Sequence, residues 1–145
     1  MKNKYKLTIL LTILLIILSC SVKLVSDYDA KTADKIIELS KRIDLFYLNL
    51  KEIQPEERLY QNVAEEYKLI EIEIRSLVLM NKIRPLNTES TQIAQQILDF
   101  WIEYKEKHKE NNTYKDSLLN IHQKRFSRLF IAMAVAEEAK IDDQE

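Results

Sequence analysis

Three side chains of this 145-residue chain belong to the types that most often carry chemistry, namely its single cysteine and its two histidines. A thiolate is a nucleophile and a site of modification, whereas an imidazole titrates near neutral pH and ligates metals. Cys20 lies near the N-terminus, and His108 and His122 lie in the C-terminal third. Two imidazoles without a further inward carboxylate or thiolate make a poor metal site, so we expect no metal and no other cofactor.

The chain also lacks the motifs of enzymes that use helical bundles or bound nucleotides. It has no Glu-x-x-His pair of the di-iron carboxylate proteins and no Cys-x-x-Cys-His sequence for haem attachment. Because it contains no glycine, it has neither a glycine-rich phosphate loop nor the strained turn that presents a catalytic serine. We therefore predict a protein that is not an enzyme and has no catalytic residues.

The sequence up to Cys20 has the layout of a bacterial export signal. Lysines at positions 2, 4 and 6 precede an apolar run from 7 to 18, which is short for a membrane span of about 20 residues. The residues Ile17-Leu18-Ser19-Cys20 resemble the bacterial lipobox, in which a small residue precedes an obligatory cysteine. The resemblance implies that residues 1–19 are a signal peptide that is removed, and that Cys20 receives a thioether-linked diacylglycerol and usually an N-acyl chain such as palmitate. The alternative is an uncleaved signal anchor with an incidental cysteine.

A lipid on Cys20 makes the membrane the first expected partner. Each buried methylene contributes about 0.8 kcal/mol, so two or more acyl chains give a stable attachment. Residues 20–27 would then be the lipidated cysteine and a short tether, with the rest of the chain on the exported side of the cell envelope. In proteobacteria an aspartate after the cysteine tends to retain lipoproteins in the inner membrane, so Ser21 favours the outer membrane if the cell is Gram-negative.

The remainder of the chain is predicted to be a single all-α domain. The sequence is 46% hydrophobic and 31% charged and has no glycine, which favours helices with short polar connections over sheets. Apolar residues recur every three or four positions in four segments, about 29–54, 55–84, 87–112 and 113–140. Because short connections make consecutive helices antiparallel, we predict an up-down-up-down four-helix bundle over residues 28–141 and a polar tail at 142–145.

The helical period also predicts which side chains face the core. Folding the last two helices back at Asn112 sets Tyr104 level with His122 and Trp101 level with Phe126. His122 lies on the apolar stripe, so we expect it to be buried and hydrogen-bonded to a neighbour such as Tyr104. If these two groups line a cavity instead, they are a weak candidate site for a small ligand. The predicted stripes otherwise include Ile36, Ile37, Ile43, Phe46, Tyr47, Leu50, Val63, Tyr67, Ile70, Ile74, Leu77, Ile93, Ile97, Phe100, Leu118, Leu119, Leu129 and Met133.

Two further expectations concern exposure. His108 lies in a run rich in lysine and glutamate, from 105 to 110, and we expect it to be solvated. Ile72, Val78 and Leu79 lie off the main apolar seam of the second helix. They are expected either to be buried against a second neighbour, which we favour, or to offer an apolar surface to a partner.

From Ser26-Asp27-Tyr28-Asp29 through Ala139-Lys140, the chain resembles small all-helical bacterial lipoproteins. The resemblance implies no activity and no site residues. The formal charge is −1, and it becomes −4 when the three lysines before Cys20 are removed. This mild acidity is spread along the chain and argues against nucleic acid as a partner.

Three functions fit these observations. The first is a tethered, non-enzymatic interaction module that binds an envelope protein as a scaffold, assembly factor or inhibitor. The second is a small-ligand or metal-binding envelope lipoprotein that uses the Tyr104/His122 region. The third is an immunity or exclusion lipoprotein that blocks an incoming toxin or phage component. An exposed apolar patch along Ile72 and Leu79 would favour the first and third, and a buried polar cavity at His122 would favour the second.

Overall fold

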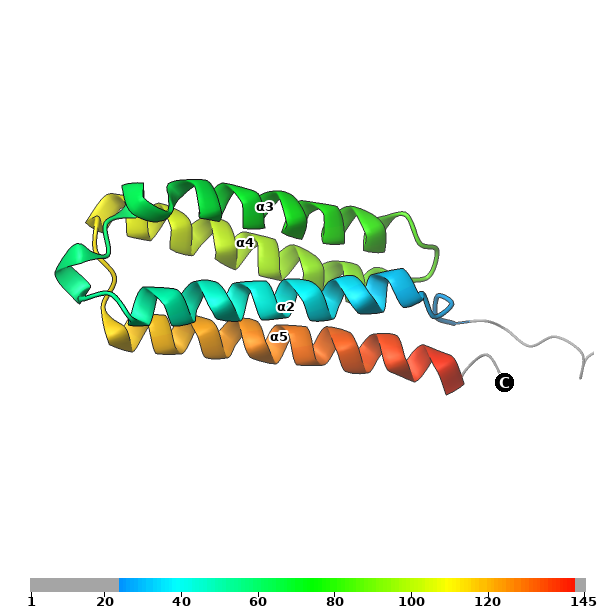
Figure 1. The fold of residues 1–145 in the computed structure, drawn as a ribbon. Helices are drawn as coiled ribbons and strands as arrows, with labels where there is room; N and C mark the ends of the chain where they lie inside the picture. Colours follow the sequence, from blue (N-terminus) through cyan, green and yellow to red (C-terminus); the bar gives the residue numbers. More distant parts are fainter. Residues whose placement is uncertain (1–23, 143–145) are drawn as a thin grey trace, which may run out of the picture.

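The computed structural model describes residues 24–142, which form four long α-helices joined by short connections (Figure 1). α2 covers Ala30–Lys51, α3 Tyr60–Lys82, α4 Thr88–Asn111 and α5 Asp116–Asp142, and a 3-10 turn, η1, covers Pro55–Glu57. The described residues contain no strand, and successive helices run in opposite directions. The predicted all-α, up-down-up-down four-helix bundle is therefore confirmed.

Several predicted features lie outside the described residues, namely the signal peptide, Cys20, the first residues of the tether and all of the tail predicted at 142–145 except Asp142, which ends α5. Within the described part of the chain, no helix combines the length and the apolar character that crossing a bilayer needs. The fold begins earlier than expected, because Ser26 is only 4% exposed and its hydroxyl donates a hydrogen bond to Asn87 Oδ1 at 3.0 Å. Ser26, which was predicted to belong to the tether at 20–27, is therefore part of the packed structure.

Side-chain and left-handed caps set the ends of two helices. Asp29 caps α2, because its carboxylate accepts a hydrogen bond from the Thr32 amide at 2.6 Å. α4 ends where Asn112 adopts a left-handed conformation (φ 49°), which lets its N–H donate to the His108 carbonyl at 2.8 Å. Asparagine tolerates this conformation better than most residues, so it does here what a C-terminal glycine does in other helices.

The sequence predicted that the second helix begins at about position 55, but α3 begins at Tyr60. Residues 55–57 form the 3-10 turn, and Arg58 then leaves the helical region with ψ 58°. The Arg58 side chain is 3% exposed and donates to the carbonyls of Ile53 (2.8 Å) and Tyr114 (2.7 Å). It therefore ties the α2–α3 and α4–α5 connections together, which the local sequence does not reveal. The fourth helix likewise begins at 116, not 113.

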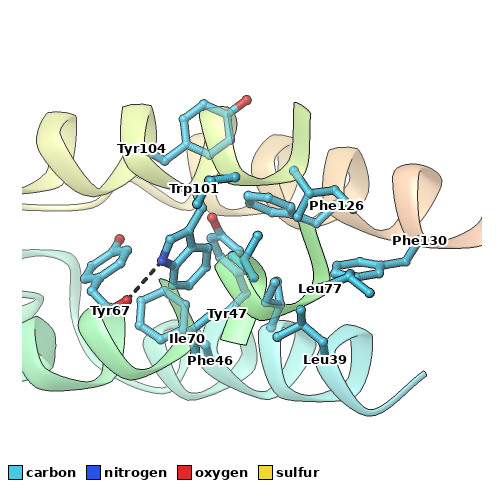
Figure 2. Packing of buried hydrophobic residues seen from close by; sticks show 14 of the residues in the cluster. Leu39, Phe46, Tyr47, Tyr67, Ile70, Leu77, Trp101, Tyr104, Phe126 and Phe130 are labelled. Atoms are coloured by element: carbon cyan, nitrogen blue, oxygen red, sulfur yellow. Dashed lines mark hydrogen bonds between the residues drawn. The ribbon is translucent and has the colours of Figure 1, made fainter. Parts of the chain in front are cut away.

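An aromatic cluster with members from all four helices fills the middle of the bundle (Figure 2). The ring centroids of Phe46 and Tyr67 are 4.7 Å apart, those of Phe46 and Trp101 5.2 Å, and those of Trp101 and Phe126 5.8 Å. The Trp101 indole N–H donates to the Tyr67 carbonyl at 3.0 Å, the dashed line in Figure 2. The contact between Trp101 and Phe126 confirms the register predicted for α4 and α5.

The predicted stripe is correct on α3, whereas the stripes of α2 and α5 each include one residue that is exposed, and the stripe of α2 omits the buried Leu39. Ile37 is 46% exposed, whereas Leu39 is fully buried, and Leu118 is 43% exposed, whereas Leu119 is fully buried. Since a helix turns by about 100° per residue, adjacent side chains point in different directions, and here Ile37 and Leu118 point away from the core whereas Ile36 and Leu119 point into it. The predicted seam of α3 is confirmed by the complete burial of Tyr67, Ile70, Ile74 and Leu77.

The four helices do not pack equally. α2 packs most extensively on α5, and α3 packs most extensively on α4, whereas the chain neighbours α4 and α5 share a smaller contact. The last helix is therefore held mainly by the first. Its other side borders α4 less closely, and a groove lies between these two helices.

Candidate functional site

Tyr104 and His122 lie face to face, as the predicted register requires. Their rings are parallel within 3°, with centroids 3.4 Å apart. The hydrogen-bond partner of His122 is not Tyr104, however, because Nδ1 pairs with the hydroxyl of Tyr114. Burial, together with the charges of Arg125 and Lys107, lowers the pKa of His122 to about 4. The imidazole is therefore neutral at physiological pH.

Tyr104 and His122 are both buried and belong to the core of the bundle. The Tyr104 ring covers one face of the imidazole, and the Tyr104 hydroxyl accepts a hydrogen bond from Arg125. The two groups proposed as a weak ligand site are thus together, but His122 Nδ1 and the Tyr104 hydroxyl each have a protein partner already. In the part of the chain that the structure describes, no three histidine, cysteine, aspartate or glutamate side chains are grouped so as to hold a metal ion.

His108 is buried, and the expectation that it is solvated is wrong. It is 2% exposed, its Nε2 lies 2.7 Å from the Arg58 carbonyl, and its Nδ1 lies 3.1 Å from the Tyr67 hydroxyl. Since a carbonyl only accepts, Nε2 carries the proton and Nδ1 accepts from Tyr67. Burial lowers the pKa of His108, which keeps this neutral form. The helical period could have found it, because position 108 is one turn beyond Tyr104.

The surface opposite the core on α5 is a feature that the sequence analysis missed. Apolar and cationic side chains, most of them spaced three or four residues apart, follow one line along this helix. Ile121, Ile131 and Val135 are 52%, 60% and 62% exposed. We call this surface the α5 outer face; its members are Leu118, Ile121, Lys124, Arg125, Arg128, Ile131 and Val135.

A groove between α4 and the α5 outer face has a volume of about 590 Å³. Its apolar lining comes from Phe100, Ile121 and Leu129, and neither Tyr104 nor His122 lines it; its polar lining comes from Gln96, Lys124, Arg125 and Arg128. The Arg125 guanidinium carbon lies 4.7 Å above the centre of the Phe100 ring, a cation–π contact that holds the charge at the groove.

The cations of this groove have no carboxylate partners among the described residues. Within residues 24–142, neither Lys124 nor Arg128 forms an ion pair, and Arg125 is bonded to the neutral Tyr104 hydroxyl. The reason lies in the sequence of α5, which contains no aspartate or glutamate from position 117 to 136. None of the other three helices contains a stretch this long without an acidic residue. This gap in acidic residues is the signal from which the cationic surface could have been predicted.

A second exposed apolar line runs along α3. Ile72 and Leu79 are 56% and 59% exposed, so the favoured prediction that they are buried is wrong, whereas Val78 packs against the edge of the core. Leu69 and Ile83 extend the line and are 43% and 73% exposed. The buried seam of α3 already contacts α2 and α4, and no further helix of the described chain covers this side. The alternative expectation, an apolar surface, is the one the structure supports.

Comparison with protein-family models, with curated protein sequences and with solved structures finds no match to this chain. The function of the α5 outer face is therefore inferred from the chemistry of its own side chains.

Proposed function

We propose that this protein is a lipid-anchored, non-enzymatic interaction module of the bacterial cell envelope. In this proposal Cys20 carries the lipid, the bundle lies on the exported side, and the membrane is the outer one if the cell is Gram-negative. The bundle binds an envelope protein through the α5 outer face, as a scaffold, assembly factor or inhibitor.

The observation that supports this function best is the combination of apolar and unpaired cationic groups on the α5 outer face. Exposed Ile121, Ile131 and Val135 supply apolar area, and burying such area favours association. Lys124 and Arg128 supply positive charge that no carboxylate of the described residues neutralises. The complementary partner is an acidic, amphipathic segment of a protein, because its carboxylates would pair with these cations and steer the encounter.

The anchor is supported by the sequence before the bundle. A positive start, a short apolar run and Ser19-Cys20 together match the order of a lipoprotein signal. Metabolic labelling with an alkyne fatty acid tests this part, since Cys20→Ala should abolish labelling and block maturation. Unchanged labelling of Cys20→Ala would contradict the anchor.

Site-specific photo-crosslinking in growing cells tests the partner surface. A photoreactive amino acid at Ile131, on the α5 outer face, should give a discrete crosslinked protein band. The same group at Leu48, a 50% exposed residue of α2, serves as the matched control and should not give that band. The double charge reversal Lys124→Glu with Arg128→Glu should weaken the crosslink at least about tenfold, whereas Lys109→Glu on α4 should not. The crosslinked peptide of the partner should be rich in aspartate and glutamate.

Other outcomes would contradict the proposed function or favour one of its alternatives. Equal crosslinks from Ile131 and Leu48, or a crosslink that survives charge reversal, would contradict a specific acidic partner. A crosslink to a second copy of this chain or to lipid alone would also contradict it. A crosslinked toxin or phage component would identify the immunity or exclusion form of the same interaction. Binding of a small molecule or metal that is lost in His122→Gln but kept after charge reversal would favour the ligand-binding alternative.

A further inference from the structure

One end of the bundle is where the chain enters the fold from the predicted anchor. We call it the N-terminal end; it comprises residues 24–29, the first turn of α2, the α3–α4 connection and the last turns of α5 (Figure 1). The Ser26 amide donates to the Leu86 carbonyl at 3.1 Å, and the Ser26 hydroxyl donates to Asn87 Oδ1 at 3.0 Å. These two bonds fasten the entering chain directly to the α3–α4 connection.

A buried ionic group joins three parts of the chain at this end. Glu137 is 1% exposed and accepts hydrogen bonds from Arg84 (2.7 and 2.9 Å), from Lys140 (2.6 Å) and from the Asp29 amide (2.9 Å). Arg84 also donates to the Asp27 carbonyl. The entering chain, the α3–α4 connection and α5 are therefore joined at one carboxylate.

Large apolar side chains protrude from the same end. Leu24 is 79% exposed, Ile83 73% and Leu86 53%. All three are close in sequence to residues of the hydrogen-bonded network at this end, such as Ser26 and Arg84. Leu86 also has a φ of 56°, in the left-handed region that a bulky residue rarely adopts. The exposed Lys82 lies beside them in sequence, and a lysine bordering apolar residues suits the headgroup level of a bilayer.

Covalent geometry limits how far this end can lie from the anchor. Ser26 is six residues after Cys20, and an extended chain spans about 3.3 to 3.6 Å per residue, so the two are at most about 22 Å apart. Because Ser26 is bonded to the Leu86 carbonyl, the same limit holds the exposed leucine near the membrane surface. The membrane lies at this end whether Cys20 carries lipid or the apolar run 7–18 is kept as an anchor.

We propose that the N-terminal end of the bundle docks on the bilayer, with Leu24, Ile83 and Leu86 at the boundary between headgroups and acyl chains. This inference rests on the proposed membrane anchor. It adds an orientation, since docking by one end sets the helices upright on the membrane. The α5 outer face then points sideways, along the membrane surface, where it meets other envelope proteins.

The docking can be tested by measuring how deeply a fluorescent probe at the N-terminal end of the bundle enters the bilayer of a lipid vesicle. Cys20 is the only cysteine, and lipid blocks its thiol, so Leu86→Cys introduces the single reactive thiol of the mature protein. The full-length lipidated protein is labelled there with an environment-sensitive fluorophore and reconstituted into phosphatidylethanolamine and phosphatidylglycerol vesicles. Leu118→Cys, 43% exposed at the opposite end of the bundle, is the matched control. Lipids brominated on their acyl chains should quench the probe at 86 at least about threefold more than the probe at 118.

Flotation of the same vesicles separates the two proposals. Protein that floats with the vesicles and is quenched at 86, but not at 118, supports docking. Protein that floats but shows equal, water-like emission at both positions overturns docking and leaves the anchor intact. Protein that fails to float overturns the anchor and the docking with it. Ile83→Cys should repeat the result at 86, and a water-exposed probe at 83 would also contradict the inference.

Discussion

Arg84 and Glu137 form a two-pronged ion pair, with the guanidinium nitrogens 2.7 and 2.9 Å from the two carboxylate oxygens. The pair joins the α3–α4 connection to α5, and Lys140 adds a second cation to the same carboxylate at 2.6 Å. Although burial raises the pKa of Glu137, the hydrogen bonds from Arg84 and Lys140 lower it below the usual value. The carboxylate is therefore ionised and is the charge on which this end of the bundle depends.

Replacing the carboxylate should leave two cations without their counter-charge. We expect Glu137→Gln to lower the free energy of unfolding by about 3 kcal/mol, since removing one partner of a buried ion pair leaves an uncompensated charge. The neighbouring Glu138→Gln, at an exposed position, should change it by less than about 0.5 kcal/mol. Urea unfolding followed by circular dichroism measures both. A loss below about 1 kcal/mol in Glu137→Gln would show that the network adds little to stability.

His122 should make stability depend on pH. The pKa of its imidazole is about 4 in the folded protein, against an ordinary value of 6.5, so below pH 6.5 the unfolded chain binds a proton that the folded chain does not. The contribution of His122 to stability is therefore fully present above pH 6.5 and is lost progressively as the pH drops to about 4, by an amount on the order of 3 kcal/mol. His108 acts in the same direction, because burial lowers its pKa too. In His122→Gln the loss between pH 6.5 and 4 should be clearly smaller; an identical pH profile would mean that His122 is not held neutral.

A matched pair on α3 tests which side of that helix is buried. Ile70 is fully buried, whereas Ile72 is 56% exposed. We expect Ile70→Ala to cost about 2 to 5 kcal/mol in the free energy of unfolding, because it removes packed methyl groups and leaves a cavity. Ile72→Ala should cost less than about 0.5 kcal/mol. Similar losses for both variants would mean that Ile72 is covered in solution, for example by a partner copy.

The left-handed backbone conformation of Leu86 should lower the free energy of unfolding, and substitution by glycine should recover that loss. Glycine adopts a φ of 56° without the steric penalty of a Cβ atom, so Leu86→Gly should stabilise the bundle by about 0.5 to 1 kcal/mol. Leu86→Ala keeps the Cβ atom and should show no such gain. If thermal or urea unfolding shows Leu86→Gly to be no more stable than Leu86→Ala, the backbone there is relaxed.

Much of this architecture could be predicted because it depends on local periodicity. The seam Tyr67, Ile70, Ile74 and Leu77 follows from spacing alone, and so does the register that places Trp101 against Phe126. The pattern is less informative where two apolar residues are adjacent, as at Ile36 and Ile37, because period alone does not choose between them.

The candidate surface and the polar contacts were harder to predict. His108 lies among lysines and glutamates in sequence, yet Arg58 and Tyr67, 50 and 41 positions away, supply its hydrogen-bond partners. Ile72 and Leu79 are apolar residues that the bundle leaves exposed, because a bundle of four gives α3 only two close neighbours among the described helices. Neither result follows from counting hydrophobic positions.

Local patterns in the chain were enough to predict the helical class and the positions of the four helices to within a few residues. That Cys20 carries a lipid stays a prediction from the same kind of pattern. These features depend on residues close together in sequence, through the helical period, the prolines and the signal-like N-terminus. Packing of the folded chain was needed to show that Ser26 joins Leu86, that Glu137 gathers Arg84 and Lys140, and that α5 presents cations beside exposed isoleucines. Most of these contacts join residues far apart in sequence, and which of them form depends on how the helices lie against one another, which no single segment specifies.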